Sequence, residues 1–203
     1  MSASKIIGRT IKAIDIEIAV SRMFNPRVNL IVPNVSWGLN LHECDLLVVT
    51  KSGYAYEVEI KISRADLKAD MLKRHGHHSK LIRRLYFAIP RTLLHCIEFV
   101  PARAGIISVG DPEVWLSKND DDYFSCNIER EAEILPGAPP LSESERFQVA
   151  RLGTMRIWSL KKKIVRLKNK VAAITSPNTP MPSEAPQIAA DIAEVELKAA
   201  TSA

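Results

Sequence analysis

The stretch that decides the fold is "ECDLLVVTKSGYAYEVEIKISRAD", residues 43–66. It holds two apolar runs rich in β-branched and aromatic residues, joined by Lys-Ser-Gly, which predicts a β-hairpin. Asp45, Glu59 and Lys61 lie inside these runs, although burying an unpaired charge costs several kcal/mol. The charges therefore need either a compensating cation or an open cleft.

Strand periodicity sorts these charges. Residues two apart point to one side of a strand, so Glu57, Glu59 and Lys61 share a face. Asp45 opens the neighbouring strand, within reach of the end of this one. Carboxylate oxygens suit Mg²⁺, and a lysine beside them can orient the attacking water and offset phosphoryl charge. The pattern predicts metal-assisted phosphodiester hydrolysis, and on spacing alone a Glu59–Lys61 surface ion pair stays open.

The flanking segments predict an α/β or α+β unit with a mixed central sheet. Capping residues, turn signals and apolar periodicity set the element boundaries. In chain order, we expect a helix at 10–24, strands at 27–35, 45–50 and 54–61, a helix at 63–76, a strand at 83–90, a helix at 92–99 and a last strand at 104–110.

The charged residues of this hairpin resemble the signature of a known family. Asp45, followed by Glu59-Ile60-Lys61, resembles the D…(D/E)-x-K signature of the PD-(D/E)XK nuclease superfamily, which has a restriction-endonuclease-like αβββαβ core. The continuation "VEIKISRADLKAD" and the later strands resemble more narrowly the MmcB-like DNA repair branch and related phage proteins. The resemblance covers about residues 10–110. Cys44 stands where the superfamily name has proline.

The resemblance implies a metal site and a substrate. It implies that Asp45, Glu59 and the Ile60 carbonyl are metal ligands and that Lys61 is the catalytic lysine. The implied cofactor is Mg²⁺ or Mn²⁺, and the implied partner is DNA. Glu17 sits where many members carry an extra acidic residue and is a further catalytic candidate.

The remaining acidic residues are either alternative catalytic candidates or are expected to have no catalytic role. Asp15 competes with Glu17 on the first helix. Glu57 is expected to lie further from the metal. Asp66 and Asp70 are expected to pair with lysine or arginine along their own helix.

Basic residues after Lys61 are candidates for holding phosphates, because basic side chains and helix N-terminal amides bind phosphate oxygens. The run 61–91 holds nine Lys or Arg against two Asp and is expected to line the substrate cleft. Ser63 is expected chiefly to cap its helix, and the two roles are compatible. The candidate nucleic-acid-binding residues are Ser63, Arg64, Lys68, Lys73 and Arg74.

Three histidines, two tryptophans and three cysteines have ordinary explanations. The run "HGHH" (residues 75–78) lacks partner ligands at helical or Cys-type spacing, so it is expected to be a solvent-exposed loop near the nucleic acid. Trp115 and Trp158 are expected to be core anchors rather than base-stacking residues. The cysteines are expected to be small core hydrophobes: Cys44, Cys96 and Cys126.

The C-terminal part is basic. Residues 111–141 lack strong periodicity and are expected to form an irregular connector. Ser142 and Glu145 form a capping box that opens a long helix over 142–174, with nine basic and two acidic residues. Its apolar residues, spaced by three and four, form a heptad seam: Ile157, Leu160, Ile164, Leu167, Val171 and Ile174.

The heptad seam leaves two packing arrangements open. The helix packs on the core or a neighbour, or it joins a homo-oligomer through residues 150–174. Residues 175–203 switch to Ser, Pro, Thr and Ala and are expected to form a flexible tail.

The sequence also predicts the location and the function of the chain. No apolar run approaches the roughly 18 residues of a membrane span, and no secretory signal is evident, so we expect a cytoplasmic protein. We expect residues 1–110 to be a Mg²⁺-dependent DNA nuclease, an endonuclease rather than an exonuclease, acting in repair, recombination or phage DNA processing. The alternative is a catalytically idle nuclease fold that binds nucleic acid or mediates assembly. A third reading makes the heptad helix the functional part.

Overall fold

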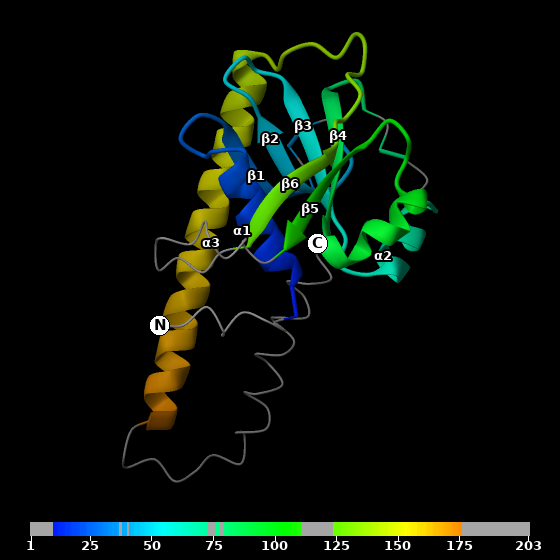
Figure 1. The fold of residues 1–203 in the computed structure, drawn as a ribbon. Helices are drawn as coiled ribbons and strands as arrows, with labels where there is room; N and C mark the ends of the chain where they lie inside the picture. Colours follow the sequence, from blue (N-terminus) through cyan, green and yellow to red (C-terminus); the bar gives the residue numbers. More distant parts are fainter. Residues whose placement is uncertain are drawn as a thin grey trace.

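Six strands form one sheet in which each strand pairs with its sequence neighbour, in the order β1-β2-β3-β4-β5-β6 (Figure 1). The computed structural model describes residues 10–36, 38–39, 41–72, 76–77, 79–110 and 124–175. The strands are β1 (Leu30–Val35), β2 (Cys44–Val49), β3 (Ala55–Ile60), β4 (Ile82–Pro90), β5 (Gly105–Gly110) and β6 (Ser125–Arg130). The helices are α1 (Ala13–Met23), α2 (Arg64–Asp70), the 3₁₀ helix η2 (Arg91–Phe99) and α3 (Glu143–Thr175).

The sheet is mixed, which confirms the predicted α+β class. The predicted hairpin is the antiparallel pair β2 and β3, whereas β3–β4 and β4–β5 are parallel. A parallel pair needs a crossover, and α2 lies in the one that joins β3 to β4. The carboxyl ends of these strands consequently lie side by side, where the Lys61 N–H donates to the Ala88 carbonyl over 3.0 Å.

Three apolar clusters hold the layers together. On one face, α1 packs through Ile16 and Val20 against the sheet. On the other, the start of α3 covers β1 and β2, while α2 and η2 cover β4 and β5 around Phe87. The side chains of Glu57 and Glu59 belong to none of these clusters, although both are fully buried.

The sequence missed one strand. The segment expected to be an irregular connector contains β6, which pairs antiparallel with β5, so β5 is not the last strand. β6 lies at the sheet edge and carries "SCNIER", whose side chains are half-buried or exposed. An edge strand with solvent on its outer side lacks the apolar pattern by which strands are predicted.

Two helix boundaries also differ from expectation. α1 begins at Ala13 rather than Thr10, because the Asp15 carboxylate accepts the Lys12 N–H at 2.9 Å and closes the first turn there. α2 ends at Asp70, well before Gly76.

Helix α3 leaves the sheet after its first turns (Figure 1). The capping box is confirmed: the Ser142 N–H donates to Glu145 Oε2 at 2.7 Å, and the Glu145 N–H donates to Ser142 Oγ at 3.2 Å. Val149 and Leu152 are buried against the sheet, and the Arg156 guanidinium donates to the Asn34 carbonyl.

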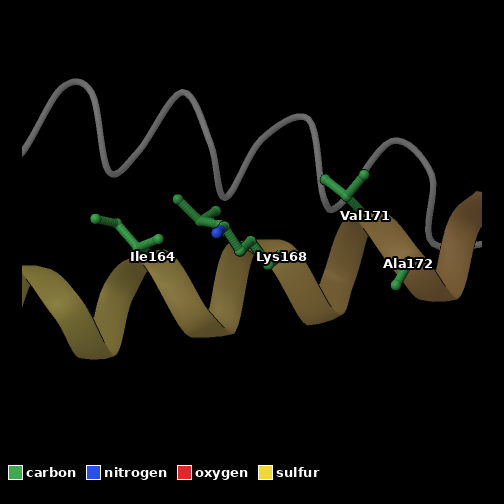
Figure 2. A pocket seen from close by; sticks show the side chains of 5 residues that line it. Ile164, Lys168, Val171 and Ala172 are labelled. Atoms are coloured by element: carbon green, nitrogen blue, oxygen red, sulfur yellow. The ribbon is translucent and has the colours of Figure 1, made fainter.

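Beyond this point the α3 side chains face solvent. Residues 157–173 are all exposed. Figure 2 shows Ile164 and Val171 projecting from the helix beside Lys168. Trp158 is 58% exposed, so the core-anchor prediction for it is wrong. Ile174 and the tail after Thr175 lie outside the described side chains. None of the described helices combines the length and apolarity that a membrane span requires.

Candidate functional site

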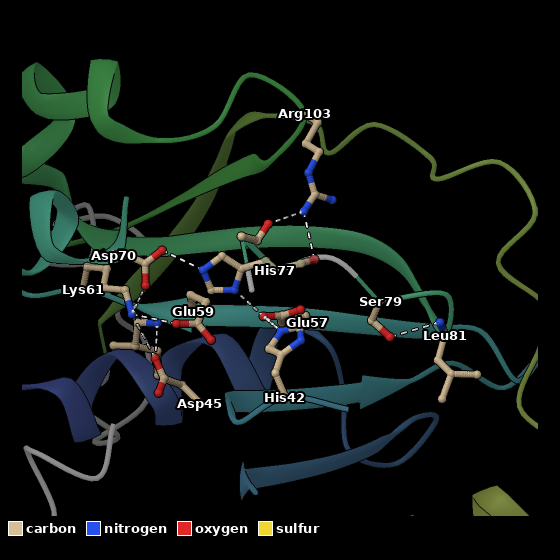
Figure 3. Close-up of polar contacts among 12 residues, drawn as sticks. His42, Asp45, Glu57, Glu59, Lys61, Asp70, His77, Ser79, Leu81 and Arg103 are labelled. Atoms are coloured by element: carbon tan, nitrogen blue, oxygen red, sulfur yellow. Dashed lines mark hydrogen bonds and ion pairs between the residues drawn. The ribbon is translucent and has the colours of Figure 1, made fainter. Parts of the chain in front are cut away.

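Buried charged side chains gather around β3, between the apolar clusters on the α2 side of the sheet (Figure 3). Glu57, Glu59 and Lys61 leave the strand on the predicted shared face and are 0%, 1% and 6% exposed. Asp70 and His77 join them from the crossover segment, and both are buried. Buried charges are tolerated only when they are paired and hydrogen-bonded, and these form one connected network.

The structure brings together three of the four predicted catalytic residues, Asp45, Glu59 and Lys61. Lys61 Nζ donates to Glu59 Oε2 at 2.7 Å and lies 3.7 Å from Asp45 Oδ2. Asp45 Oδ2 also accepts the Ile60 N–H at 2.7 Å, and the Ile60 carbonyl remains a predicted ligand. Burial alone would lower the pKa of Lys61, but the charges of Glu59 and Asp45 raise it above its usual value. Lys61 is therefore a cation held between two carboxylates.

Glu17, rather than Asp15, is the acidic residue of α1 that lies near this group. Burial and the charge of Asp45 raise the pKa of Glu17. Asp15 instead caps the helix through the Lys12 N–H. Asp15 is therefore the capping residue of α1, and Glu17 remains the predicted catalytic residue of this helix.

The predicted DNA-binding residues of α2 lie on an exposed edge next to the site. Ser63 caps the helix as expected, its Oγ accepting the Asp66 N–H at 3.1 Å. The cationic groups of Arg64 and Lys68 are exposed, and each lies 5.3 Å from the centre of the Phe99 ring. Lys73, Arg74, His75, His78 and Trp115 lie outside the described residues.

The basic run does not line one cleft. β3 and β4 are parallel with Tyr56 opposite Arg84, so Arg83 and Arg84 lie at the far end of the strands from Lys61. There Arg83 stacks on Tyr54, 4.0 Å from the ring centre, and Arg84 binds Glu131 at 3.0 Å. The expectation for the whole run is wrong, because Lys61 turns inward and these arginines have structural partners.

Asp70 is not a surface partner on its own helix. Its Oδ2 accepts from His77 Nε2 at 2.7 Å, and its Oδ1 lies 3.1 Å from Lys61 Nζ. Asp70 follows Leu67 by three residues, and both face the core. That spacing was the one sequence signal that could have placed its carboxylate inside the fold.

His77 is buried, which corrects the prediction of a solvent-exposed loop. It is 2% exposed, and its Nδ1–H donates to Glu57 Oε1 at 2.7 Å while its Nε2–H donates to Asp70. Burial opposes protonation, but these hydrogen bonds raise the pKa of His77 to about 9. Arg103 fixes the adjacent backbone by donating to the Gly76 and His77 carbonyls at 3.1 and 2.9 Å.

Glu57 is part of the network rather than a bystander. Its Oε1 also accepts from His42 Nε2 at 2.7 Å. Burial would raise the pKa of Glu57, but the hydrogen bonds from His42 and His77 lower it. His42 lies in the segment before β2, fifteen residues from its partner Glu57, and no spacing rule links the two.

The cysteines follow expectation in part. Cys44 and Cys96 are buried, and Cys126 is half-buried on the edge strand β6. Burial raises the pKa of the Cys126 thiol to about 11. All three are free thiols within the described residues.

Comparison with known proteins gives a fold neighbour. No family model matches the chain, and no curated protein matches it. The solved structure of the SPO1766 protein of unknown function from Silicibacter pomeroyi is similar, with a TM-score of 0.50 and 17% sequence identity over 76% of this chain and 89% of that one. At this identity the likeness shows a shared fold alone.

Proposed function

We propose that the chain is a metal-dependent nuclease of the PD-(D/E)XK type that hydrolyses DNA phosphodiester bonds. The observation that carries the proposal is the convergence of Asp45, Glu59 and the buried cation Lys61 at the carboxyl end of β3. From the sequence resemblance, we expect the nuclease to be an endonuclease. We expect it to act in DNA repair, recombination or phage DNA processing.

The donor set fits Mg²⁺ or Mn²⁺. Asp45 and Glu59, with the Ile60 carbonyl, offer the oxygen ligands that these ions take from proteins. Around them, four carboxylates (Asp45, Glu57, Glu59 and Asp70) face two cations (Lys61 and His77), which leaves two negative charges among these six groups. A divalent cation would balance that excess. When bound, it would supply Lewis-acid polarisation of the phosphoryl group.

Lys61 has the position and charge for transition-state stabilisation. Its ammonium would offset the negative charge that develops on the phosphoryl oxygens and would orient the attacking water. Asp70 would keep Lys61 in place when the carboxylates of Asp45 and Glu59 turn to a metal ion, because Asp70 Oδ1 already lies 3.1 Å from Nζ.

Basic side chains beside the site would hold the DNA backbone. Arg64 and Lys68 are exposed and share the Phe99 ring as a support, which limits their motion. Phosphate contacts of this kind position a duplex without reading its sequence. Their binding contribution should fall steeply with salt.

A second candidate function is DNA binding or assembly by an idle nuclease fold. The observation in its favour is that the Lys61 ammonium already lies between Asp45 and Glu59, where it neutralises part of their charge. Self-association through the exposed apolar residues of α3 is the assembly mode that we propose alongside either function.

A cleavage assay separates the two functions. Linear, circular, single-stranded and branched DNA are incubated with the chain in Mg²⁺ or Mn²⁺, beside Lys61→Ala and the control Lys162→Ala on exposed α3. The proposal expects metal-dependent cleavage by the parent and the control and a loss of at least a hundredfold in Lys61→Ala. Equal cleavage by Lys61→Ala, or none by the parent, would contradict it, and salt-sensitive binding without cleavage would favour the second function.

A further inference from the structure

A second set of ligands lies next to the Asp45–Glu59 pair. His42 Nε2 and His77 Nδ1 each lie 2.7 Å from the same atom, Glu57 Oε1 (Figure 3). One ligand atom of each residue lies within 4.8 Å of the other two, although the residues come from the segment before β2, from β3 and from the crossover to β4. We propose that His42, Glu57 and His77 form a binding site for a transition-metal ion of the zinc type.

The donor chemistry separates this site from the one proposed for Mg²⁺. Two imidazole nitrogens and one carboxylate oxygen make a ligand set that catalytic zinc sites use, with a fourth position left for water or substrate. Imidazole favours Zn²⁺ and its neighbours in the first transition row, whereas oxygen-only sets favour Mg²⁺ and Mn²⁺. The two adjacent sites therefore select different ions.

The burial of Glu57 supports a bound cation. Its side chain has no solvent exposure, and within the described part of the chain its Oε2 accepts no hydrogen bond. A buried carboxylate oxygen without a donor costs on the order of 1 to 3 kcal/mol. A metal ion held by the carboxylate would offset that cost.

The surroundings of His77 match those of a metal-bound histidine. Such a histidine donates its second ring N–H to a carboxylate, which fixes the tautomer and the ring orientation. His77 does so through Nε2–H to Asp70 Oδ2 at 2.7 Å, and Arg103 holds its backbone. A metal ion would take the place of the proton on Nδ1.

The proposed site can be tested because an ion can reach it and because it shares no ligand with the proposed Mg²⁺ site. His42 is the most exposed member, with 12% of its side chain accessible, so an ion can enter from its side. None of the three ligands is shared with Asp45, Glu59 or Lys61. Metal binding here can thus be measured whether or not the chain cleaves DNA.

The test is a metal titration of the full, tag-free chain after dialysis against a chelator. We expect one equivalent of Zn²⁺ to bind with a dissociation constant at or below the micromolar range. Co²⁺ should give the visible absorption of a tetrahedral site. His42→Gln and Glu57→Gln should each weaken binding at least tenfold, and Asp70→Asn about tenfold, as for a residue that orients a ligand.

Two controls keep the result interpretable. His95→Gln removes an exposed histidine of η2 and should leave binding unchanged. Circular dichroism checks that each variant folds, and His42→Gln, at the most exposed ligand, carries the test if Glu57→Gln does not fold. The proposal would be overturned if Zn²⁺ and Co²⁺ fail to bind the parent at micromolar concentration, or if His42→Gln binds as the parent does.

Discussion

The Nζ of Lys61 lies 3.1 Å from Oδ1 of Asp70, although Lys61 follows β3 and Asp70 is the last residue of helix α2. Asp70 contacts His77 through its other oxygen, so this one carboxylate joins the Asp45–Glu59–Lys61 group to the Glu57–histidine group. Lys61 therefore has a fixed partner outside the pair of proposed Mg²⁺ ligands.

Replacing Asp70 should affect both stability and cleavage. Asp70→Asn removes the charge that holds Lys61 and His77, and we expect a loss of about 1 to 3 kcal/mol in the free energy of unfolding. The rate constant of cleavage at saturating DNA should fall about tenfold, with little change in KM. Urea unfolding and single-turnover kinetics measure the two effects. Asp66→Asn, on the exposed side of the same helix, is the matched control, and equal behaviour of both variants would contradict the prediction.

Removing Glu57 should be more damaging than removing a surface carboxylate. Glu57→Leu leaves His42 and His77 without their shared acceptor, and breaking a buried ion pair in this way costs about 3 to 5 kcal/mol. Glu43→Gln, at an exposed position, should stay within about 0.5 kcal/mol of the parent. The free energy of unfolding in urea checks both values.

A triple replacement tests whether the stability that Glu57→Leu loses is lost because buried charges are left unpaired. Exchanging His42, Glu57 and His77 together for Phe, Leu and Phe removes these three polar side chains at once and leaves Asp70 paired with Lys61. Well-packed apolar groups can replace a buried ion pair at little cost. This triple variant should be more stable than Glu57→Leu, and a lower stability would contradict the explanation.

Gly105 is closed to any side chain. A Cβ there would lie 2.4 Å from the Tyr86 ring and 2.7 Å from the Ala132 nitrogen. The Tyr86 ring packs on Phe24 and Tyr56, with centroids 6.1 and 6.4 Å away, and cannot easily yield. Gly105→Ala should lower the free energy of unfolding by about 3 kcal/mol.

Gly153→Ala serves as the contrast in the same urea experiment. Its Cβ would meet Val32 Cγ2 at 3.3 Å, and the gain in helix propensity, about 1 kcal/mol, works against that contact. We expect a net change below about 1 kcal/mol. A larger loss at Gly153 than at Gly105 would show that crowding is not what governs the β5–β6 edge.

The sequence predicts the parts of this fold that have local signals. The hairpin, β4, β5 and the Ser142–Glu145 cap rest on alternation, turns and capping residues, and the structure confirms them. β6 is not predicted from the sequence, because an edge strand can be polar on both sides.

The residues of the site also fall into two groups, those that local sequence signals predict and those that they do not. Asp45, Glu59 and Lys61 lie on two adjacent strands, so their approach follows from strand geometry. His42, Asp70 and His77 reach Glu57 or Lys61 only through the crossover and loops. Apart from the helical spacing of Asp70 from Leu67, no periodicity encodes such contacts, and the sequence therefore gives no warning that His77 is buried.

The cap of α3 should be pH-dependent. Hydrogen bonds from the Ser142 hydroxyl and N–H lower the pKa of Glu145 below its ordinary 4.5. A lowered folded-state pKa means that the stabilisation is present above pH 4.5 and is lost as the pH falls through the folded value. Ser142→Ala should cost about 1 kcal/mol at pH 7, and less at an acidic pH at which Glu145 is protonated. Urea unfolding at both pH values tests this, and a pH-independent difference would argue against the carboxylate.

If the heptad seam of α3 forms a dimer, the stability of that dimer should rise with salt concentration. If Leu160 and Leu167 lie at a dimer seam, the flanking heptad positions are Lys161, Lys163, Lys168 and Lys170, all basic. Repulsion between two such helices is screened by salt, so the dimer should be tighter in 500 mM than in 50 mM NaCl. Sedimentation equilibrium measures this, with Leu160→Asp/Leu167→Asp as the monomeric control. A dimer that persists in the control would exclude the stripe as its interface.

The alternation of acid and base around Glu57 also constrains how the chain can change during evolution. Glu57, Asp70 and His77 each contact two other members of the network, so a single apolar replacement of one of them takes a partner away from two groups. Homologous chains should therefore keep His42, Glu57 and His77 together or lose them together. Covariation among these positions would reveal the network without any structure.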